Sequence, residues 1–137
     1  MAERTIYFEI FNDTNHTLSL GEADEVHGGW ALFKSPPLII SSNSSGNFQI
    51  ESSGTFTGAE AKVSYIINLN EKNYDRIKNK NEDPHQVELF LHLDNPFAGS
   101  NVFNFRFEGP QKDLFHLKQP TNLSGEDAEW AVTLTKK

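Results

Sequence analysis

The sequence predicts an all-β protein, an antiparallel sandwich or barrel that forms one domain over residues 1–137. Apolar residues recur at every second position in five separate runs, which is the pattern of strands with one buried face. Clusters of Gly, Pro, Asn and Ser separate these runs, and no segment carries an apolar stripe with helical spacing over three turns. Many short strands joined by frequent turns are typical of sandwiches and barrels.

The alternating runs predict the principal strands. In chain order they cover residues 5–11, 61–68, 87–93, 103–108 and 129–134. In the first run, Ile6, Phe8 and Ile10 share the face that we expect to be buried. Shorter apolar runs predict further strands at residues 17–20, 30–33, 38–40, 48–51 and 115–117. One long polar connection, residues 70–86, is expected to be flexible and to be cut first by a protease.

Composition excludes several classes of function. The chain has no cysteine, so disulfides, thiolate zinc sites and cysteine nucleophiles are ruled out. The net charge of −7 argues against nucleic acid as a partner and against anionic lipid, because both are bound by clustered Lys and Arg. The N-terminus lacks the layout of a signal peptide, so we expect a protein made in the cytoplasm that acts elsewhere only after release.

The sequence offers little chemistry for catalysis. It contains no Gly-x-Ser-x-Gly, no phosphate-binding Gly-rich loop and no dinucleotide fingerprint. His92 with Asp94, and Asp24 with His27, are spaced as half of a metal site, but neither pair has a third ligand nearby in sequence. We therefore expect no cofactor and no metal, and we expect that the protein is not an enzyme.

Aromatic residues stand at three turns. Phe97 lies within the turn Asp94-Asn95-Pro96-Phe97-Ala98-Gly99, where we expect the strand-like run to end, because Pro96 fixes φ and Gly99 admits a left-handed backbone. Trp30 follows His27-Gly28-Gly29, and Phe56 lies in a turn flanked by glycines. Aromatic side chains at loop tips suit a boundary that is apolar on one side and wet on the other.

Each of these aromatics also has a structural interpretation. We expect Trp30 to begin a strand and pack in the core, and Phe97 to pack beneath its own turn. For Phe56 the core and the surface remain equal alternatives. The candidate membrane or ligand contacts are Trp30, Phe56, Phe97, His27, Asn95 and Asn101.

Several segments together resemble the aegerolysin family. The matching segments are Asn12-Asp13-Thr14-Asn15-His16-Thr17-Leu18, Gly28-Gly29-Trp30, Glu51-Ser52-Ser53-Gly54-Thr55-Phe56-Thr57-Gly58-Ala59-Glu60, Tyr65-Ile66-Ile67 and Asp94-Asn95-Pro96-Phe97-Ala98-Gly99-Ser100-Asn101. They span most of the chain in the expected order, and they are most similar to the small component of bacterial binary insecticidal crystal toxins. The chain departs from the family at Ala61, where a Gly is usual, and over residues 104–127.

The resemblance implies an antiparallel β-sandwich like that of sea-anemone pore formers. It also implies binding to a target-cell membrane of neutral or zwitterionic lipid, and action with a larger β-rich partner protein that completes a pore. By the same resemblance the protein is expected to accumulate in a bacterial cytoplasm, where it can form a crystal inclusion. Partner choice is not transferred, because the divergent residues 104–127 could determine it.

Two other classes of function remain open. In a carbohydrate-binding module, the aromatic faces and the neighbouring Asn and Asp side chains would stack on and hydrogen-bond to a sugar. In a structural or interaction protein they would bind no ligand at all. Vesicle binding separates the toxin component from the carbohydrate-binding module, and the absence of any ligand would leave the third class.

Overall fold

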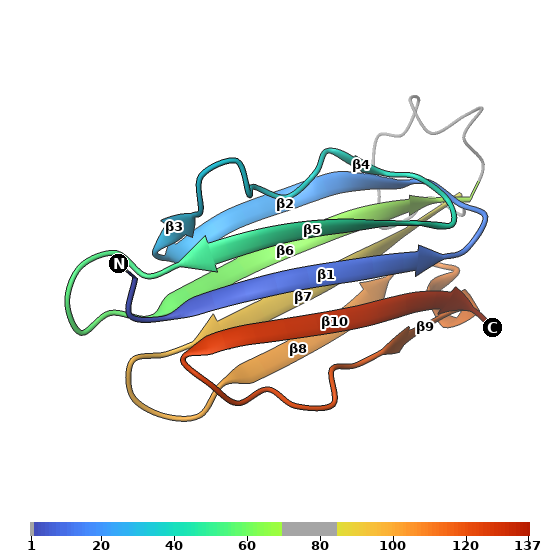
Figure 1. The fold of residues 1–137 in the computed structure, drawn as a ribbon. Helices are drawn as coiled ribbons and strands as arrows, with labels where there is room; N and C mark the ends of the chain where they lie inside the picture. The colour runs from blue at the N-terminus through green and yellow to red at the C-terminus, as the bar shows by residue number, and fades with distance from the viewer. Residues whose placement is uncertain (1, 70–84) are drawn as a thin grey trace.

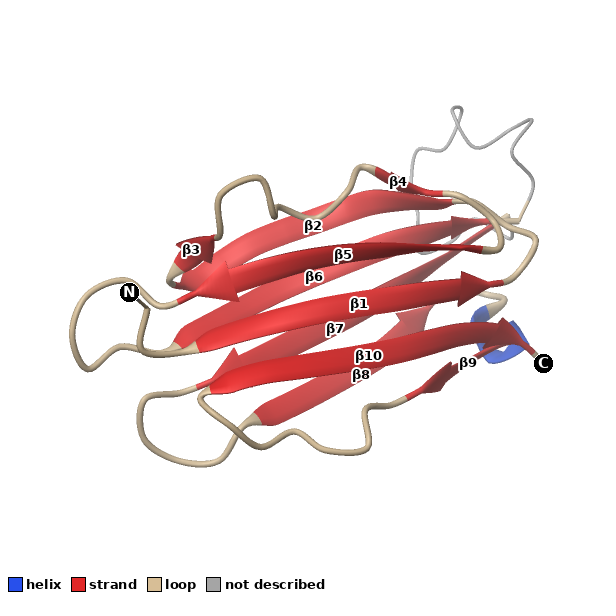
Figure 2. Cartoon of the chain, viewed as in Figure 1, coloured by secondary structure: helices blue, strands red, loops and turns tan. Residues whose placement is uncertain are grey.

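The computed structural model describes residues 2–69 and 85–137, and these form two packed five-stranded sheets (Figures 1 and 2). One sheet, with the order β3-β5-β1-β10-β9, is called the β1 sheet, and the other, with the order β4-β2-β6-β7-β8, is called the β6 sheet. The strands are β1 Thr5–Asp13, β2 Leu18–His27, β3 Gly29–Trp30, β4 Ile39–Ile40, β5 Ser44–Glu51, β6 Ala59–Asn68, β7 Gln86–Asn95, β8 Val102–Glu108, β9 Phe115–Lys118 and β10 Asp127–Lys136. A 3-10 helix, Lys112–Leu114, precedes β9.

The all-β sandwich predicted from the alternating pattern is confirmed. All five long runs are strands, and their alternate apolar side chains face the core, buried except for Phe105 and Phe107 of β8, which are partly buried. Ile6, Phe8 and Ile10 of β1 are fully buried. Across the sandwich they join residues such as Tyr65 and Leu91 of the β6 sheet in one hydrophobic cluster. The core therefore lies between the two sheets, and each sheet keeps one face toward solvent.

Tyr65 links this core to the β3–β4 connection. Its ring is buried, and its hydroxyl donates a hydrogen bond to the carbonyl oxygen of Pro37 at 2.8 Å. Burial raises the pKa of Tyr65, because the phenolate would lose its hydration. The hydrogen bond fixes part of the connection that crosses the open edge of the sandwich.

Three features differ from the sequence-based expectation, and a fourth expectation falls largely outside the described residues. β2 continues to His27, well beyond residue 20. The sequence-based prediction stopped short because the second half of the strand is exposed and polar and carries no alternation. The strand expected at residues 30–33 ends at Trp30. β1 and β10 pair in parallel, although every other pair of described strands is antiparallel. The predicted flexible connection 70–86 lies outside the described residues at positions 70–84, and its last residue, Gln86, begins β7.

Gly28 marks the place where the chain passes from one sheet to the other. β2 belongs to the β6 sheet, and β3 begins one residue after Gly28 in the β1 sheet. Gly28 has a φ of +87°, and a Cβ at this position would clash with the carbonyl oxygen of Glu51. Only glycine combines this backbone conformation with so close an approach.

Two loops and the N-terminal residues lie together at one end of the sandwich. The β5–β6 loop and the β7–β8 loop both project at the left of Figure 1, beside the start of the chain. β6 begins at this end and β7 terminates there, since the two strands pair from Ala59 with Asn95 to Asn68 with Gln86. Residues that are far apart in the sequence are thereby gathered at a single end.

Candidate functional site

The two loops place two phenylalanine rings in contact. Phe56 of the β5–β6 loop packs edge-to-face on Phe97 of the β7–β8 loop, with 5.1 Å between the ring centroids and 83° between the ring planes. Phe56 is 73% exposed and Phe97 is 37% exposed, so the pair faces solvent. Phe97 is therefore more exposed than the packing beneath its turn that we expected, and Phe56 is a surface residue. We call these two residues the phenylalanine pair.

The backbone at Phe56 adopts an unusual conformation. Its φ is +57°, a left-handed value that bulky side chains seldom adopt. The backbone N–H of Phe56 donates to a carboxylate oxygen of Glu3 at 2.7 Å, and the hydroxyl of Thr57 donates to the carbonyl oxygen of Gly54 at 3.0 Å. These bonds hold the loop in a shape that points the ring of Phe56 away from the core.

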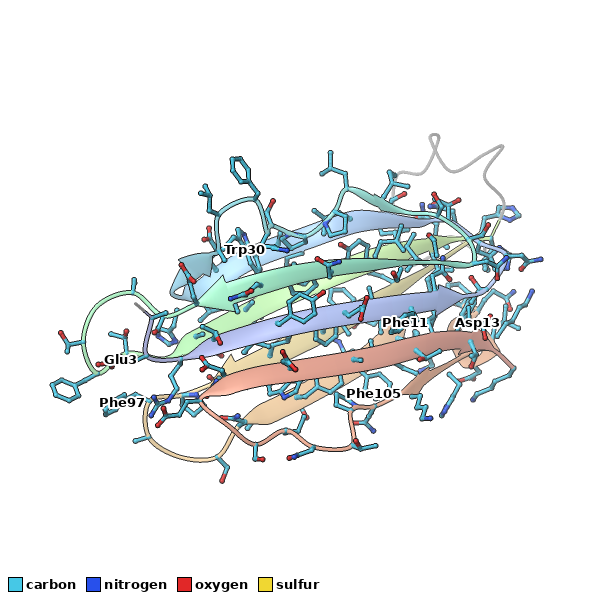
Figure 3. All side chains as sticks on the ribbon, in the orientation of Figure 1. Glu3, Phe11, Asp13, Trp30, Phe97 and Phe105 are labelled. Carbon is cyan, nitrogen blue, oxygen red and sulfur yellow. The ribbon has the colours of Figure 1, made fainter. Side chains whose placement is uncertain are left out.

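Arg4 ties the phenylalanine pair to the first strand. Its guanidinium lies 4.9 Å from the ring centroid of Phe97, which is within cation–π distance. The same group donates to the carbonyl oxygen of Phe97 at 2.9 Å and lies 3.7 Å from the carboxylate of Glu126. Figure 3 shows Phe97 and Glu3 at this end, with Phe11 and Asp13 toward the opposite end. Arg4 therefore positions the β7–β8 loop while Glu126 partly neutralises its charge.

A shallow cleft of about 470 Å³ adjoins Phe97. Among its lining residues are Arg4, Ser100, Leu123 and Glu126. This combination offers an apolar wall, a cation, an anion and a hydroxyl within the size range of small-molecule sites. The cleft is suited to a small group that carries both charges.

Asn95 and Asn101 line this cleft, and their amide nitrogens hold this end of the sandwich together. Asn95 is 1% exposed, and its amide nitrogen donates to the carbonyl oxygens of Thr5 and Glu126, both at 2.9 Å. The amide of Asn101 donates to the carbonyl oxygens of Leu123 at 2.6 Å and Gly125 at 3.0 Å. Both are candidates for ligand contact, and the bonds of their amide nitrogens to β1 and to the loop that precedes β10 fix their positions in the cleft.

Trp30 lies apart from the phenylalanine pair. Its side chain is half-buried and packs edge-on against Phe48 of the core, with 5.7 Å between ring centroids. Its backbone N–H donates to the carboxylate of Glu25 at 2.9 Å. The three aromatics selected from the sequence thus do not converge, because β3 joins the edge of the β1 sheet.

His27 belongs to a hydrogen-bonded cluster on the outer face of the β6 sheet. Nδ1 of His27 lies 2.8 Å from one carboxylate oxygen of Glu60, and Nε2 of His92 lies 2.6 Å from the other. Asp94 is the direct cross-strand partner of Glu60. Glu60 is the residue that links the two halves of the cluster, and no spacing in the sequence indicated it. In the part of the chain that the structure describes, no group of three or more His, Cys, Asp or Glu is arranged to hold a metal ion.

The environment shifts both carboxyl groups of the cluster. Burial alone would raise the pKa of Glu60, but the hydrogen bonds of His92 and His27, together with their charges, hold this pKa below its usual value. Burial raises the pKa of Asp94, and the charge of Glu60 raises it further, while His92 and His27 offset part of the effect. Glu60 is thus stabilised as a carboxylate, and Asp94 is destabilised as one.

A second apolar tip was not expected from the sequence. Leu32 and Phe33, in the connection between β3 and β4, are 80% and 94% exposed, and Phe33 also has a left-handed φ of +60°. Residues 30–33 were predicted as a strand, so Phe33 was assigned to the fold. Pro36 and Pro37 were the available signal that this segment leaves the sheet. In Figure 1 this connection arches above the sandwich.

The sheet order defines a β-sandwich of two five-stranded sheets with two loops gathered at one end. A similar fold occurs in the crystal structure of the lipid-binding protein Nakanori, with a TM-score of 0.70 over 99% of this chain and 73% of that chain. The sequences are 10% identical, so the likeness shows a shared fold. No protein-family model matches the chain, and no curated protein matches its sequence. Among the described residues, no helix has the length and apolar character to cross a membrane.

Proposed function

We propose that the protein binds the surface of a target-cell membrane through the phenylalanine pair. The observation that carries the proposal is Phe56, a ring 73% exposed to water on a left-handed backbone. Such a backbone costs about 1–3 kcal/mol and persists where the surrounding structure imposes it, often at functional sites. Insertion of the ring into a headgroup layer removes apolar surface from water, and this gain would offset the cost of the left-handed backbone.

The charges of this end favour a neutral or zwitterionic lipid. The chain carries a net charge of −7, and the carboxylates of Glu3 and Glu126 lie beside Arg4 and the phenylalanine pair. An anionic bilayer would repel this end, because no basic cluster is present among these residues to attract it. A headgroup with one positive and one negative charge matches the cleft beside Phe97, which is lined by Arg4 and Glu126.

Leu32 and Phe33 form a second candidate contact with the same bilayer. They are more exposed than the phenylalanine pair, and Lys34 follows them with its side chain also exposed. An aromatic and aliphatic tip followed by a Lys suits a headgroup layer, where the ammonium can stay in water. Separate substitutions in the two loops determine whether one or both touch lipid.

We further propose that the protein is the small subunit of a binary pore-forming insecticidal toxin and acts with a larger β-rich partner. The support is the resemblance over Asn12–Leu18 and Asp94–Asn101 to the small components of such toxins, together with the aegerolysin-type fold. In this proposal the protein is a binding component and not an enzyme. It is made in the bacterial cytoplasm, is released, and then acts at the target membrane.

Vesicle sedimentation tests the membrane contact. We expect the protein to sediment with phosphatidylcholine–sphingomyelin vesicles and to bind phosphatidylserine vesicles no better. Phe56→Ser and Phe97→Ser should weaken sedimentation. Phe11→Ser is the matched control, because Phe11 is 42% exposed on β1 and lies toward the opposite end of the sandwich (Figure 3). Equal binding by Phe56→Ser and Phe11→Ser would contradict the proposed site.

A further inference from the structure

A groove of about 560 Å³ crosses the outer face of the β6 sheet, apart from the phenylalanine pair. Its lining includes Glu22, Lys62, Phe90, His92, Asn104 and Arg106. The first comes from β2 and the others from β6, β7 and β8, so the groove runs across neighbouring strands. None of these residues takes part in the proposed lipid contact.

Strand register places the polar side chains in two adjacent rows. Lys62, His92 and Asn104 are direct cross-strand partners and form the first row. Phe90 and Arg106 are partners in the second row, two residues further along the strands. Because the intervening residues point into the core, all of these side chains share the solvent face. The arrangement is therefore built by the sheet itself and does not depend on a loop.

The groove contains hydrogen-bond donors without partners. Within the described part of the chain, Lys62 and Asn104 make no side-chain hydrogen bond and no ion pair. The Arg106 guanidinium lies 4.1 Å from the ring centroid of Phe90, and its Nε donates to Glu108 at 3.2 Å. This contact holds the guanidinium plane while its two terminal nitrogens remain able to donate.

The Glu60 cluster orients the His92 ring at the same groove. Glu60 accepts a hydrogen bond from Nε2 of His92 at 2.6 Å and is itself held by His27 at 2.8 Å. A carboxylate accepts only, so Nε2 of His92 carries the hydrogen of this bond, and the bond fixes the orientation of the ring. Glu22 adds a carboxylate acceptor on the β2 side. Donors and acceptors thus surround one groove.

From this arrangement we infer that the groove binds a neutral sugar unit of a glycan. A sugar hydroxyl both donates and accepts, so it is satisfied by the Lys, Asn and Arg donors together with the carboxylate of Glu22 and the amide oxygen of Asn104 as acceptors. An anionic ligand fits less well, because Glu22 and Glu108 offset the charges of Lys62 and Arg106. The sugar unit can come from a protein-linked glycan or from a glycolipid headgroup, since both offer the same hydroxyl groups.

The experiment measures sugar binding by NMR titration and on vesicles. The free probes are the methyl glycosides of glucose, galactose, mannose and N-acetylglucosamine, and the lipid probe is galactosylceramide in phosphatidylcholine vesicles. We expect at least one probe to bind, and Lys62→Ala or Asn104→Ala to weaken that binding roughly tenfold, because each removes a direct hydrogen bond. Lys112→Ala, which changes an exposed Lys outside this groove, should leave sugar binding unchanged.

Glu60 is assigned a positioning role, and its two variants test this. Glu60→Ala should weaken sugar binding, whereas Glu60→Gln should retain most of it, because the amide oxygen still accepts from Nε2 of His92. Binding of a free glycoside indicates a glycan source, and binding only to galactosylceramide vesicles indicates a headgroup. Absence of binding to every probe, or binding that Lys62→Ala and Asn104→Ala leave intact, would overturn the inference. Either result is independent of the vesicle experiment with Phe56→Ser.

Discussion

Phe56 is a residue whose side chain can be changed to test binding with little effect on the stability of the fold. Phe56 contributes little to the core, yet its backbone is held in a left-handed conformation by the bond from its N–H to Glu3. Asn adopts this conformation more readily than Phe, as Asn43 does in this structure with a φ of +55°. The side chain of Phe56 is therefore better explained by contact with something outside the protein than by folding.

This argument predicts the outcome of Phe56→Asn. The variant should unfold at the same temperature as the parent protein or slightly higher, with a gain of no more than about 1 kcal/mol from relieved backbone strain. Binding to phosphatidylcholine–sphingomyelin vesicles should fall. Thermal unfolding followed by circular dichroism, with sedimentation on the same samples, checks both results. A loss of several degrees in Tm would instead indicate that the ring stabilises the fold.

Asp94 gives a prediction about pH. The pKa of Asp94 is raised in the folded protein, so its ionisation opposes folding, and that cost is complete above the folded pKa. Asp94→Asn should therefore stabilise the protein at pH 7, by less than about 1 kcal/mol as for other like charges directly opposite on paired strands. The gain should vanish as the pH falls below the ordinary pKa of an aspartate, where both states are protonated. Urea unfolding at pH 7 and pH 3.5 measures the difference. An equal gain at both pH values would contradict the charge argument.

At the scale of elements, buried side-chain bonds attach the loops to the strands. Asn95 ends β7 and donates to the backbone of β1 and of the residue before β10, so three segments meet at one amide. A buried amide that satisfies several carbonyl oxygens stabilises their relative position, because each would otherwise lose its hydration without a partner.

Asn95→Ala is accordingly expected to destabilise the fold by about 1–3 kcal/mol, since buried carbonyl oxygens are left unsatisfied. Asn47→Ala is the control, because Asn47 is an exposed residue of β5. Urea unfolding of both variants at pH 7 compares the two free energies of unfolding. A variant of Asn95 as stable as the Asn47 variant would show that water replaces the amide without cost.

The elements also show how far the sequence predicts the structure. Alternation located β1, β6, β7, β8 and β10, because one face of each is buried against the opposite sheet. It missed the second half of β2, whose side chains are exposed, and it carried no information on the parallel pairing of β1 with β10. A strand with two solvated sides has no reason to alternate, and pairing direction depends on how distant segments meet.

The candidate site was predicted only in part for a related reason. Turn chemistry singled out Phe56 and Phe97, but their contact joins two different loops, and the bond between Arg4 and Phe97 joins residues separated by 93 positions. Glu60 had no motif of its own, and its role arises from cross-strand register with His27 and Asp94. The local sequence pattern predicts each turn, but the three-dimensional fold determines which turns are in contact.

At the scale of the whole molecule, the protein is a rigid sandwich that presents different surfaces at its end and on its sheet face. The phenylalanine pair lies in loops at one end, while the polar groove crosses the outer face of the β6 sheet. Such a division suits a binding component that anchors at a surface and leaves other faces free for a partner. The partner itself is part of the proposal and requires a direct test.

The two-component proposal predicts that the purified protein binds vesicles without permeabilising them. Release of an entrapped dye from phosphatidylcholine–sphingomyelin vesicles should stay at background with this protein alone, and should rise when a larger β-rich toxin encoded beside it is added. Dye release by the protein alone at nanomolar concentration would contradict the requirement for a partner.

The central claim is that Phe56 enters the membrane, and one fluorescence measurement tests it most directly. The chain has no cysteine, so Phe56→Cys and Phe11→Cys each provide a single site for an environment-sensitive fluorophore such as NBD. On addition of phosphatidylcholine–sphingomyelin vesicles, we expect a blue shift and increased emission from the label at position 56 and no change from the label at position 11. Vesicle binding with an unchanged spectrum at position 56, or with equal changes at both positions, would contradict the account.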